Sequence, residues 1–127
     1  MNKLIDKTIH SIFISDDKQY LKFVTDDGDI VYYAYGDCCS HSWFNDICGF
    51  HSLISAKVIR VEEVDSSVLH ETDSECIQSY GYKFVTTGGF ASIEFRNESN
   101  GWYGGSCHLH EGNTNKIIWK MVDDDLQ

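Results

Sequence analysis

The chain contains no proline among its 127 residues, so its turns have to be made by glycine, asparagine, aspartate and serine. It also lacks a run of about eighteen apolar residues, which a transmembrane helix would require. Residues 1–6 lack the apolar core that a secretion signal carries. From these absences we expect a cytoplasmic protein that does not interact with membranes.

Basic residues are scarce. The chain has 10 lysines and arginines against 20 aspartates and glutamates, which gives a formal net charge of -10 at pH 7. This balance argues against nonspecific binding to nucleic acids or to anionic membranes, because both need clustered positive charge. The acidic excess fits solubility first and docking onto a basic protein surface second.

The cysteines are odd in number, and the chain carries no secretion signal, so we expect free thiols and no disulfides. They are Cys38, Cys39, Cys48, Cys76 and Cys107. Hydrophobic residues make up 42% of the sequence, and no segment has the composition of a linker. We therefore expect one globular domain over residues 1–127.

Alternating apolar and polar residues predict a sheet of about eight short strands. The expected strands cover residues 8–14, 20–25, 30–35, 54–64, 77–86, 90–96, 102–110 and 116–122. Asp26-Asp27-Gly28-Asp29 is a typical hairpin turn, because Gly28 can adopt a positive φ. The first three strands should therefore form an antiparallel meander.

One short helix is predicted between Gly36 and Gly49, where Trp43, Phe44 and Ile47 would share one helical face. The resulting order is βββ-α-β-ββββ. The predicted class is α+β, with a curved and mainly antiparallel sheet that packs one short helix. A partly closed β-barrel or a sandwich with one helix is the alternative.

Residues 62–76 form the most acidic stretch of the chain and contain no lysine or arginine. The acidic residues are Glu62, Glu63, Asp65, Glu71, Asp73 and Glu75. This stretch could form an acidic loop or a strand end followed by a loop, and charge repulsion and several serines favour the acidic loop. Residues 123–127, which include three consecutive aspartates, are expected to be a frayed tail.

Two groups of residues have the side chains that metal ions prefer. The first lies within fourteen residues and consists of Cys38, Cys39, His41, Cys48 and His51. Its spacing differs from that of common zinc knuckles, and small buried thiols are the alternative interpretation. The second group is His108 and His110, which share one face of a strand, with Glu94 or His10 as a third ligand. For the second group we favour the interpretation that both histidines are exposed polar residues on the solvent-facing side of a sheet. We expect no bound cofactor.

Signatures of catalysis are missing. The sequence has no phosphate-binding loop, no dinucleotide fingerprint and no nucleophile elbow. Cys38 or Cys39 could be an activated thiol at a helix start, but no flanking signature marks a partner histidine. We therefore predict that the protein is not an enzyme.

Four segments between residues 30 and 107 carry distinctive residues: 36–44, 53–63, 80–83 and 93–105. The first has the pattern Gly-Asp-Cys-Cys-Ser-x-Ser-Trp-Phe, and the last ends in Asn-Gly-Trp-Tyr-Gly-Gly. Together they resemble a small uncharacterised protein family found in phage and prophage genomes. The resemblance implies a small phage-type accessory protein in the cytoplasm of a bacterial host, and it supplies no catalytic residues.

These observations favour a protein that binds a host or phage protein, with inhibition of a nucleic-acid-binding or defence enzyme as one form. The candidate partner-binding residues are Glu62, Glu63, Asp65, Glu71, Asp73, Glu75, Trp102 and Tyr103. A metal- or thiol-dependent function at the segment from Cys38 to His41 is one alternative. An oligomeric structural or assembly component of a phage is another, because edge strands pair easily.

Overall fold

The structure is a computed structural model and describes residues 1–37, 40–100 and 104–127. A 3-10 turn, η1 (Asn2–Leu4), opens the chain, and one short helix, α1 (Phe50–Leu53), lies between two strands. The strands are β1 (Thr8–Ser15), β2 (Tyr20–Thr25), β3 (Gly28–Gly36), β4 (His41–Cys48), β5 (Ala56–Glu71), β6 (Cys76–Thr86), β7 (Gly89–Ser99), β8 (Gly105–His110) and β9 (Trp119–Val122).

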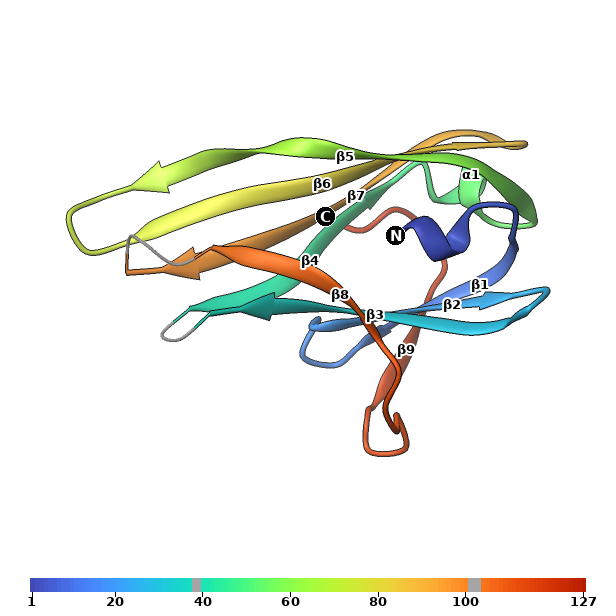
Figure 1. Cartoon of the computed structure of the whole chain (residues 1–127), viewed down its shortest axis with the longest axis horizontal. Coiled ribbons are helices and arrows are strands. Elements are labelled where there is room, and N and C mark those ends of the chain that lie inside the picture. Colours follow the sequence, from blue (N-terminus) through green and yellow to red (C-terminus); the bar gives the residue numbers. More distant parts are fainter. Residues whose placement is uncertain (38–39, 101–103) are drawn as a thin grey trace.

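All strand pairs in the described residues are antiparallel, in the order β4-β7-β6-β5-β1-β2-β3-β8, with β9 paired to β1. The sheet bends at β1 and β5, which pair only at Thr8–Lys57 and Ile9–Ala56. This short junction divides it into a first leaf, β4-β7-β6-β5, and a second leaf, β1-β2-β3-β8 with β9 (Figure 1). The prediction of a curved, mainly antiparallel sheet with one short helix is confirmed, and the sheet does not close into a barrel.

The core lies between the two leaves. Strand alternation sends Leu21, Phe23, Phe84, Ile93 and Phe95 inward, and each of these side chains is at most 3% exposed. The hairpin predicted at residues 26–29 is present, since Thr25 pairs with Gly28 and Gly28 has φ 105°. No helix in the described residues is both long and apolar enough to span a membrane.

The helix predicted between Gly36 and Gly49 is wrong. Residues 41–48 form β4, which pairs with β7, and the helix begins only after Gly49, whose φ is 74°. A bulge between Phe44 and Asp46 lets Phe44 and Ile47 both face the core despite their odd spacing. The spacing of the apolar residues resembles the apolar stripe of a helix, but pairing with β7 makes this segment a strand.

The acidic loop predicted for residues 62–76 is wrong over most of its length. Strand β5 continues to Glu71, and only residues 72–75 form the turn before β6. β6 supplies a partner strand across this whole stretch, from Val58–Thr86 to Glu71–Cys76, which outweighs the repulsion among carboxylates. The acidic residues are therefore held on a strand.

Residues 123–127, predicted to be a frayed tail, are held to the rest of the protein by hydrogen bonds. The Phe50 N–H donates to Asp125 Oδ1 at 2.8 Å, and Leu126 forms a two-way backbone bridge with Ile47. The last strand, β9, pairs with β1. The carboxyl-terminal residues thus close one side of the space between the leaves, beside β4.

Candidate protein-binding surface

The longest hairpin of the protein, β5–β6, reaches past the core at one end of the molecule. Figure 1 shows its turn at one extremity of the long axis, far from both marked chain ends. We call residues 62–76 the acidic ribbon. From Ile59 to Ser74 every residue of the hairpin except half-buried Val61 is exposed. Both faces of this part of β5 therefore meet solvent.

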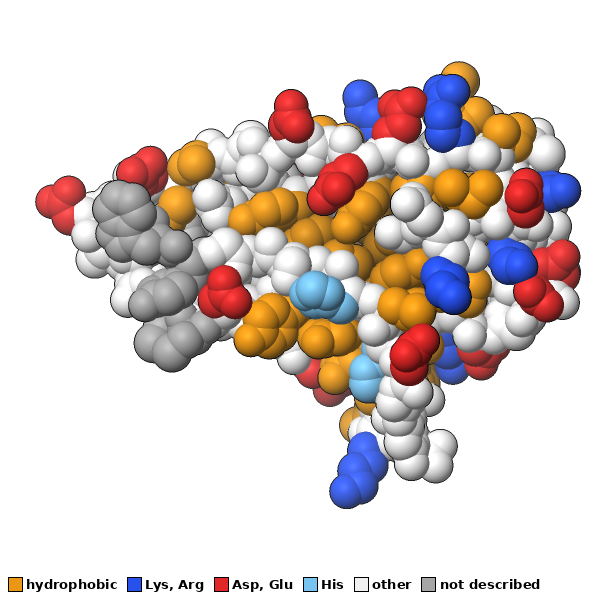
Figure 2. Space-filling view, viewed as in Figure 1, with side chains coloured by type: hydrophobic (Ala, Val, Ile, Leu, Met, Phe, Trp, Pro, Cys, Tyr) orange, Lys and Arg blue, Asp and Glu red, His pale blue; other side chains and the backbone are white. Residues whose placement is uncertain are grey.

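The ribbon carries five of the six predicted acidic residues in exposed positions, and Glu75 is half-buried. It also exposes three aliphatic side chains: Val64 at 38%, Val68 at 52% and Leu69 at 49%. The ribbon thus combines exposed carboxylates with exposed aliphatic side chains, and this combination makes it the candidate partner-binding surface. Figure 2 shows carboxylates along the β5 side of the molecule, next to a strip of apolar side chains.

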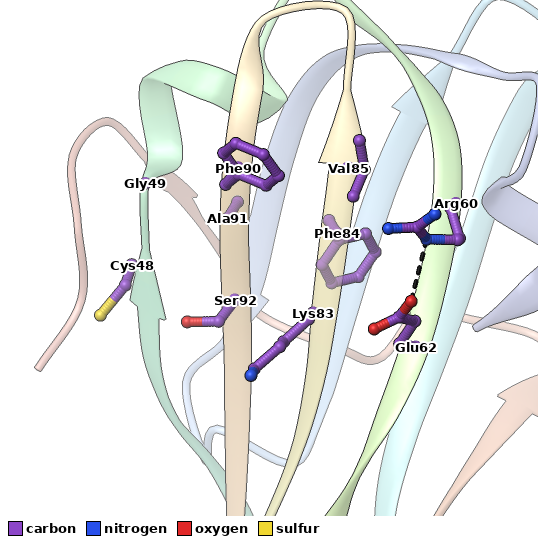
Figure 3. A pocket seen from close by; sticks show the side chains of 10 residues that line it. All are labelled: Cys48, Gly49, Arg60, Glu62, Lys83, Phe84, Val85, Phe90, Ala91 and Ser92. Atoms are coloured by element: carbon purple, nitrogen blue, oxygen red, sulfur yellow. Dashed lines mark ion pairs between the residues drawn. The ribbon is translucent and has the colours of Figure 1, made fainter.

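One predicted partner-binding residue, Glu62, is already engaged. Its Oε1 forms an ion pair with Arg60 Nε at 2.9 Å, and it lies opposite Lys83 in the β5–β6 register. These residues belong to a shallow pocket of about 390 Å³ on the outer face of the first leaf (Figure 3). Phe90, 78% exposed, stands at its rim. The charge of Glu62 is therefore partly balanced by a side chain, whereas Glu63, Asp65 and Glu71 form no ion pair within the described part of the chain.

The first predicted metal site does not form as a single cluster. His41 and Cys48 stand at opposite ends of β4, so seven extended residues place them about 20 Å apart. His51 lies beyond Cys48 in α1, and Cys38 and Cys39 fall outside the described residues. His41 stacks on Trp43 with ring centroids 5.4 Å apart. Among residues 1–37, 40–100 and 104–127, no three metal-binding side chains gather.

The second predicted metal pair, His108 and His110, lies on the outer face of the second leaf. Both rings contact Tyr33, at centroid distances of 5.7 and 6.0 Å, and Tyr20 packs edge-on against His110. Glu94, one of the two candidates for a third ligand, lies on the outer face of the other leaf, and the second candidate, His10, is an exposed residue of β1. The two histidines thus belong to an aromatic cluster.

Glu94 is instead the centre of a polar network on the outer face of the first leaf. Its carboxylate accepts hydrogen bonds from Asn45 Nδ2 at 2.9 Å, Ser79 Oγ at 2.6 Å and Arg96 Nε at 2.9 Å. Burial, together with the charge of Glu94, raises the pKa of neighbouring Asp46. The alternation of residues 90–96 placed Glu94 outward, but it did not reveal this network.

A second polar group, which the sequence did not reveal, lies inside the protein. Ser42 Oγ is 2.7 Å from Asn97 Oδ1, and both side chains are fully buried. Gly36 of β3 and Gly105 of β8 are partners in the strand register, and both lie next to Asn97. A Cβ on Gly105 would come within 2.8 Å of both Asn97 Cβ and Ser42 Oγ. The two distinctive segments, 36–44 and 93–105, therefore meet at one packed junction.

Cys107 illustrates how burial changes the pKa of a thiol in this protein. It faces the space between the leaves, where burial raises its pKa to about 12. Burial likewise raises the pKa of the neighbouring Tyr82, and Glu63 adds to that shift. A thiol held in its neutral form is a weak nucleophile and a weak metal ligand, so Cys107 is part of the core.

Trp102 and Tyr103, the remaining predicted partner-binding residues, lie outside the described residues. Asn100, which precedes them in the sequence, lines one open polar hollow of about 520 Å³ together with His41 and Glu75. The described part of the site thus consists of the ribbon and this hollow.

The fold and surface define a small antiparallel β-protein whose most exposed feature is an acidic hairpin. The chain belongs to the family described as Domain of unknown function (DUF7448), which matches residues 2–109. The family match covers strands β1 to β7 completely and β8 up to residue 109. Strand β9 lies outside the match. Comparisons with curated proteins and with solved structures find no match.

Proposed function

We propose that this protein acts by binding another protein through the acidic ribbon, as a small accessory protein of phage type. The partner we propose is a host or phage protein with a basic surface, such as a nucleic-acid-binding or defence enzyme that the ribbon would block. The observation that carries the proposal is the exposure of carboxylates and aliphatic side chains together on a hairpin that reaches past the core.

The strand conformation of the acidic ribbon supports this function better than a flexible loop would. A strand holds its carboxylates at fixed spacings of about 3.3 Å per residue, so little conformational entropy is lost when a partner binds. The alternative centred on Cys38, Cys39 and His41 would have to work without Cys48 and His51, because β4 separates these two residues from His41, and Cys38 and Cys39 lie outside the described residues. An assembly role predicts a defined oligomer, and a measurement of the oligomeric state tests it.

The test compares two variants with the same change in charge. The ribbon variant combines Glu63→Gln, Asp65→Asn and Glu71→Gln, none of which removes an ion pair formed within residues 1–37, 40–100 and 104–127. The control combines Asp16→Asn, Glu111→Gln and Asp123→Asn, three exposed acids outside the ribbon. Each protein is cross-linked in a bacterial lysate, and the captured proteins are quantified by mass spectrometry.

We expect the wild-type protein and the control variant to capture the same partner, and the ribbon variant to lose it. Long-range attraction falls with added salt, so capture should also weaken as ionic strength rises. Equal capture by the ribbon and control variants would overturn the proposal. A native mass spectrum of the purified protein shows whether a multiple of the chain mass, and therefore an assembly role, fits better.

A further inference from the structure

The outer edge of β5 carries unpaired backbone groups. One edge of β5 pairs with β6 along its whole length, whereas the other pairs with β1 only at Ala56 and Lys57. Backbone bonds from Asp6 and to Lys7 extend this contact as far as Val58. Beyond Val58, no strand of the described residues lies on this edge. The backbone N–H and C=O groups between Ile59 and Glu71 that face away from β6 therefore have no strand partner among the described residues.

Free strand edges are a hazard for a soluble protein, because they pair with any extended chain. Here the edge has two forms of protection. Register shifts interrupt β5 between Val58 and Arg60, Val64 and Ser67, and Val68 and His70. Carboxylates occupy the surface between them, at Glu63 and Asp65. Both features discourage indiscriminate pairing but leave short, accessible stretches of strand.

The charges along the free edge of β5 indicate which kind of strand could pair with it. Residues 59–71 contain four acids and one arginine, and that arginine is already bonded to Glu62. A second copy of the protein paired on this edge would bring carboxylates close to carboxylates, which destabilises a strand pair. A segment with lysine or arginine would instead place opposite charges together. The aliphatic side chains of Val64, Val68 and Leu69 add contacts for apolar residues.

We infer that the β5 edge between Val64 and Glu71 is a docking site for an extended basic segment of a partner protein, which adds to the first leaf as a further strand. Backbone hydrogen bonds supply affinity in this form of recognition, and alternate side chains supply selectivity. The inference rests on the proposed function and specifies how the ribbon binds.

The test uses two synthetic peptides of equal charge. One alternates lysine and valine, and the other replaces its central valines with proline, which keeps the lysines but cannot complete a strand ladder. Binding to the intact protein is measured by calorimetry, and amide hydrogen exchange is mapped on β5. We expect the alternating peptide to bind about tenfold or more tightly than the proline peptide and to slow exchange between Val64 and Glu71.

Each other outcome has a definite meaning. Equal binding of both peptides, lost in the ribbon variant but kept in the control, would overturn strand addition while leaving the acidic-surface function standing. Binding of neither peptide would overturn strand addition, and the lysate capture would then decide the function separately. Protection of the edge by self-association of the protein without peptide, detected by sedimentation, would assign the edge to a second copy and overturn the inference.

Discussion

Ser42 and Asn97 are 55 positions apart in the chain, yet their side chains meet at 2.7 Å in a fully buried position. Ser42 Oγ also lies 3.1 Å from the Tyr35 carbonyl, so the pair links β4, β7 and β3. Polar groups in a core destabilise a protein unless they are hydrogen-bonded, and these two groups satisfy one another. The pair therefore holds the two leaves together at the ribbon end.

Removing one member of this pair should destabilise the fold. We expect Asn97→Ala to lower the free energy of unfolding by about 1–3 kcal/mol, because it removes the nearer of the two acceptors of the Ser42 hydroxyl and opens a gap. Ser42→Ala should cost about 1 kcal/mol. Urea unfolding of both single variants and the double variant measures the coupling between them.

Glu98→Ala is the control for this experiment, since Glu98 is the exposed neighbour of Asn97 on the same strand. A cost for Asn97→Ala no larger than that for Glu98→Ala would show that the buried pair contributes nothing to stability.

Gly105 should tolerate no side chain. A Cβ at this position would lie 2.8 Å from Asn97 Cβ, a distance that real Cβ contacts essentially never show. We expect Gly105→Ala to destabilise the protein by about 1–3 kcal/mol through overpacking. Thermal unfolding measures the effect.

Gly81→Ala provides a matched glycine control in another strand. Its nearest neighbour would be the Ile93 carbonyl oxygen at 3.5 Å, which is ordinary contact. We expect little loss of stability there. Equal losses at the two positions would contradict the argument from close packing.

The thiols should differ sharply in reactivity. Cys48 is exposed, whereas Cys76 is buried and burial raises the pKa of Cys107 to about 12. Because the thiolate is the reactive form, iodoacetamide should label Cys48 at least about tenfold faster than Cys107 in the folded protein. Peptide mapping by mass spectrometry follows each site, and labelling in denaturant serves as the reference. Equal labelling of Cys107 in folded and unfolded protein would show that this thiol is not buried.

Stability should fall in alkaline solution. Burial raises the pKa of Tyr82 and of Cys107 in the folded protein, so the unfolded chain loses these protons first as pH rises. The stabilising contribution is full below the ordinary cysteine pKa, about 8.5, and is lost as pH rises toward the folded values. Melting temperatures between about pH 8 and 11 measure the decline.

Tyr82→Phe and Cys107→Ala should flatten this pH dependence, because each removes one of the buried acidic groups. Tyr35→Phe is the control, since Tyr35 is 44% exposed. A decline in melting temperature that is as steep in both core variants as in the control would rule out these two groups as its cause.

Local patterns in the sequence predicted much of the fold. Alternation of apolar residues indicated eight of the nine described strands, all except β4, although β5 continues well beyond residue 64, and Asp26-Asp27-Gly28 indicated the first hairpin. These predictions succeeded because side-chain alternation and a positive φ are properties of a few neighbouring residues. The candidate surface was predicted in part, since the ribbon carboxylates were identified while the ribbon was expected to be a loop.

The sequence alone determined the acidic charge, the mainly antiparallel sheet and the residues that face the core. Tertiary structure decided that residues 41–48 form a strand, because a bulge and pairing with β7 outweighed a helical spacing of apolar residues. It also decided that Glu62 to Glu71 lie on a strand, that His41 and Cys48 are separated, and that Ser42 meets Asn97. These relationships depend on strands distant in the chain, and only long-range pairing brings such strands together.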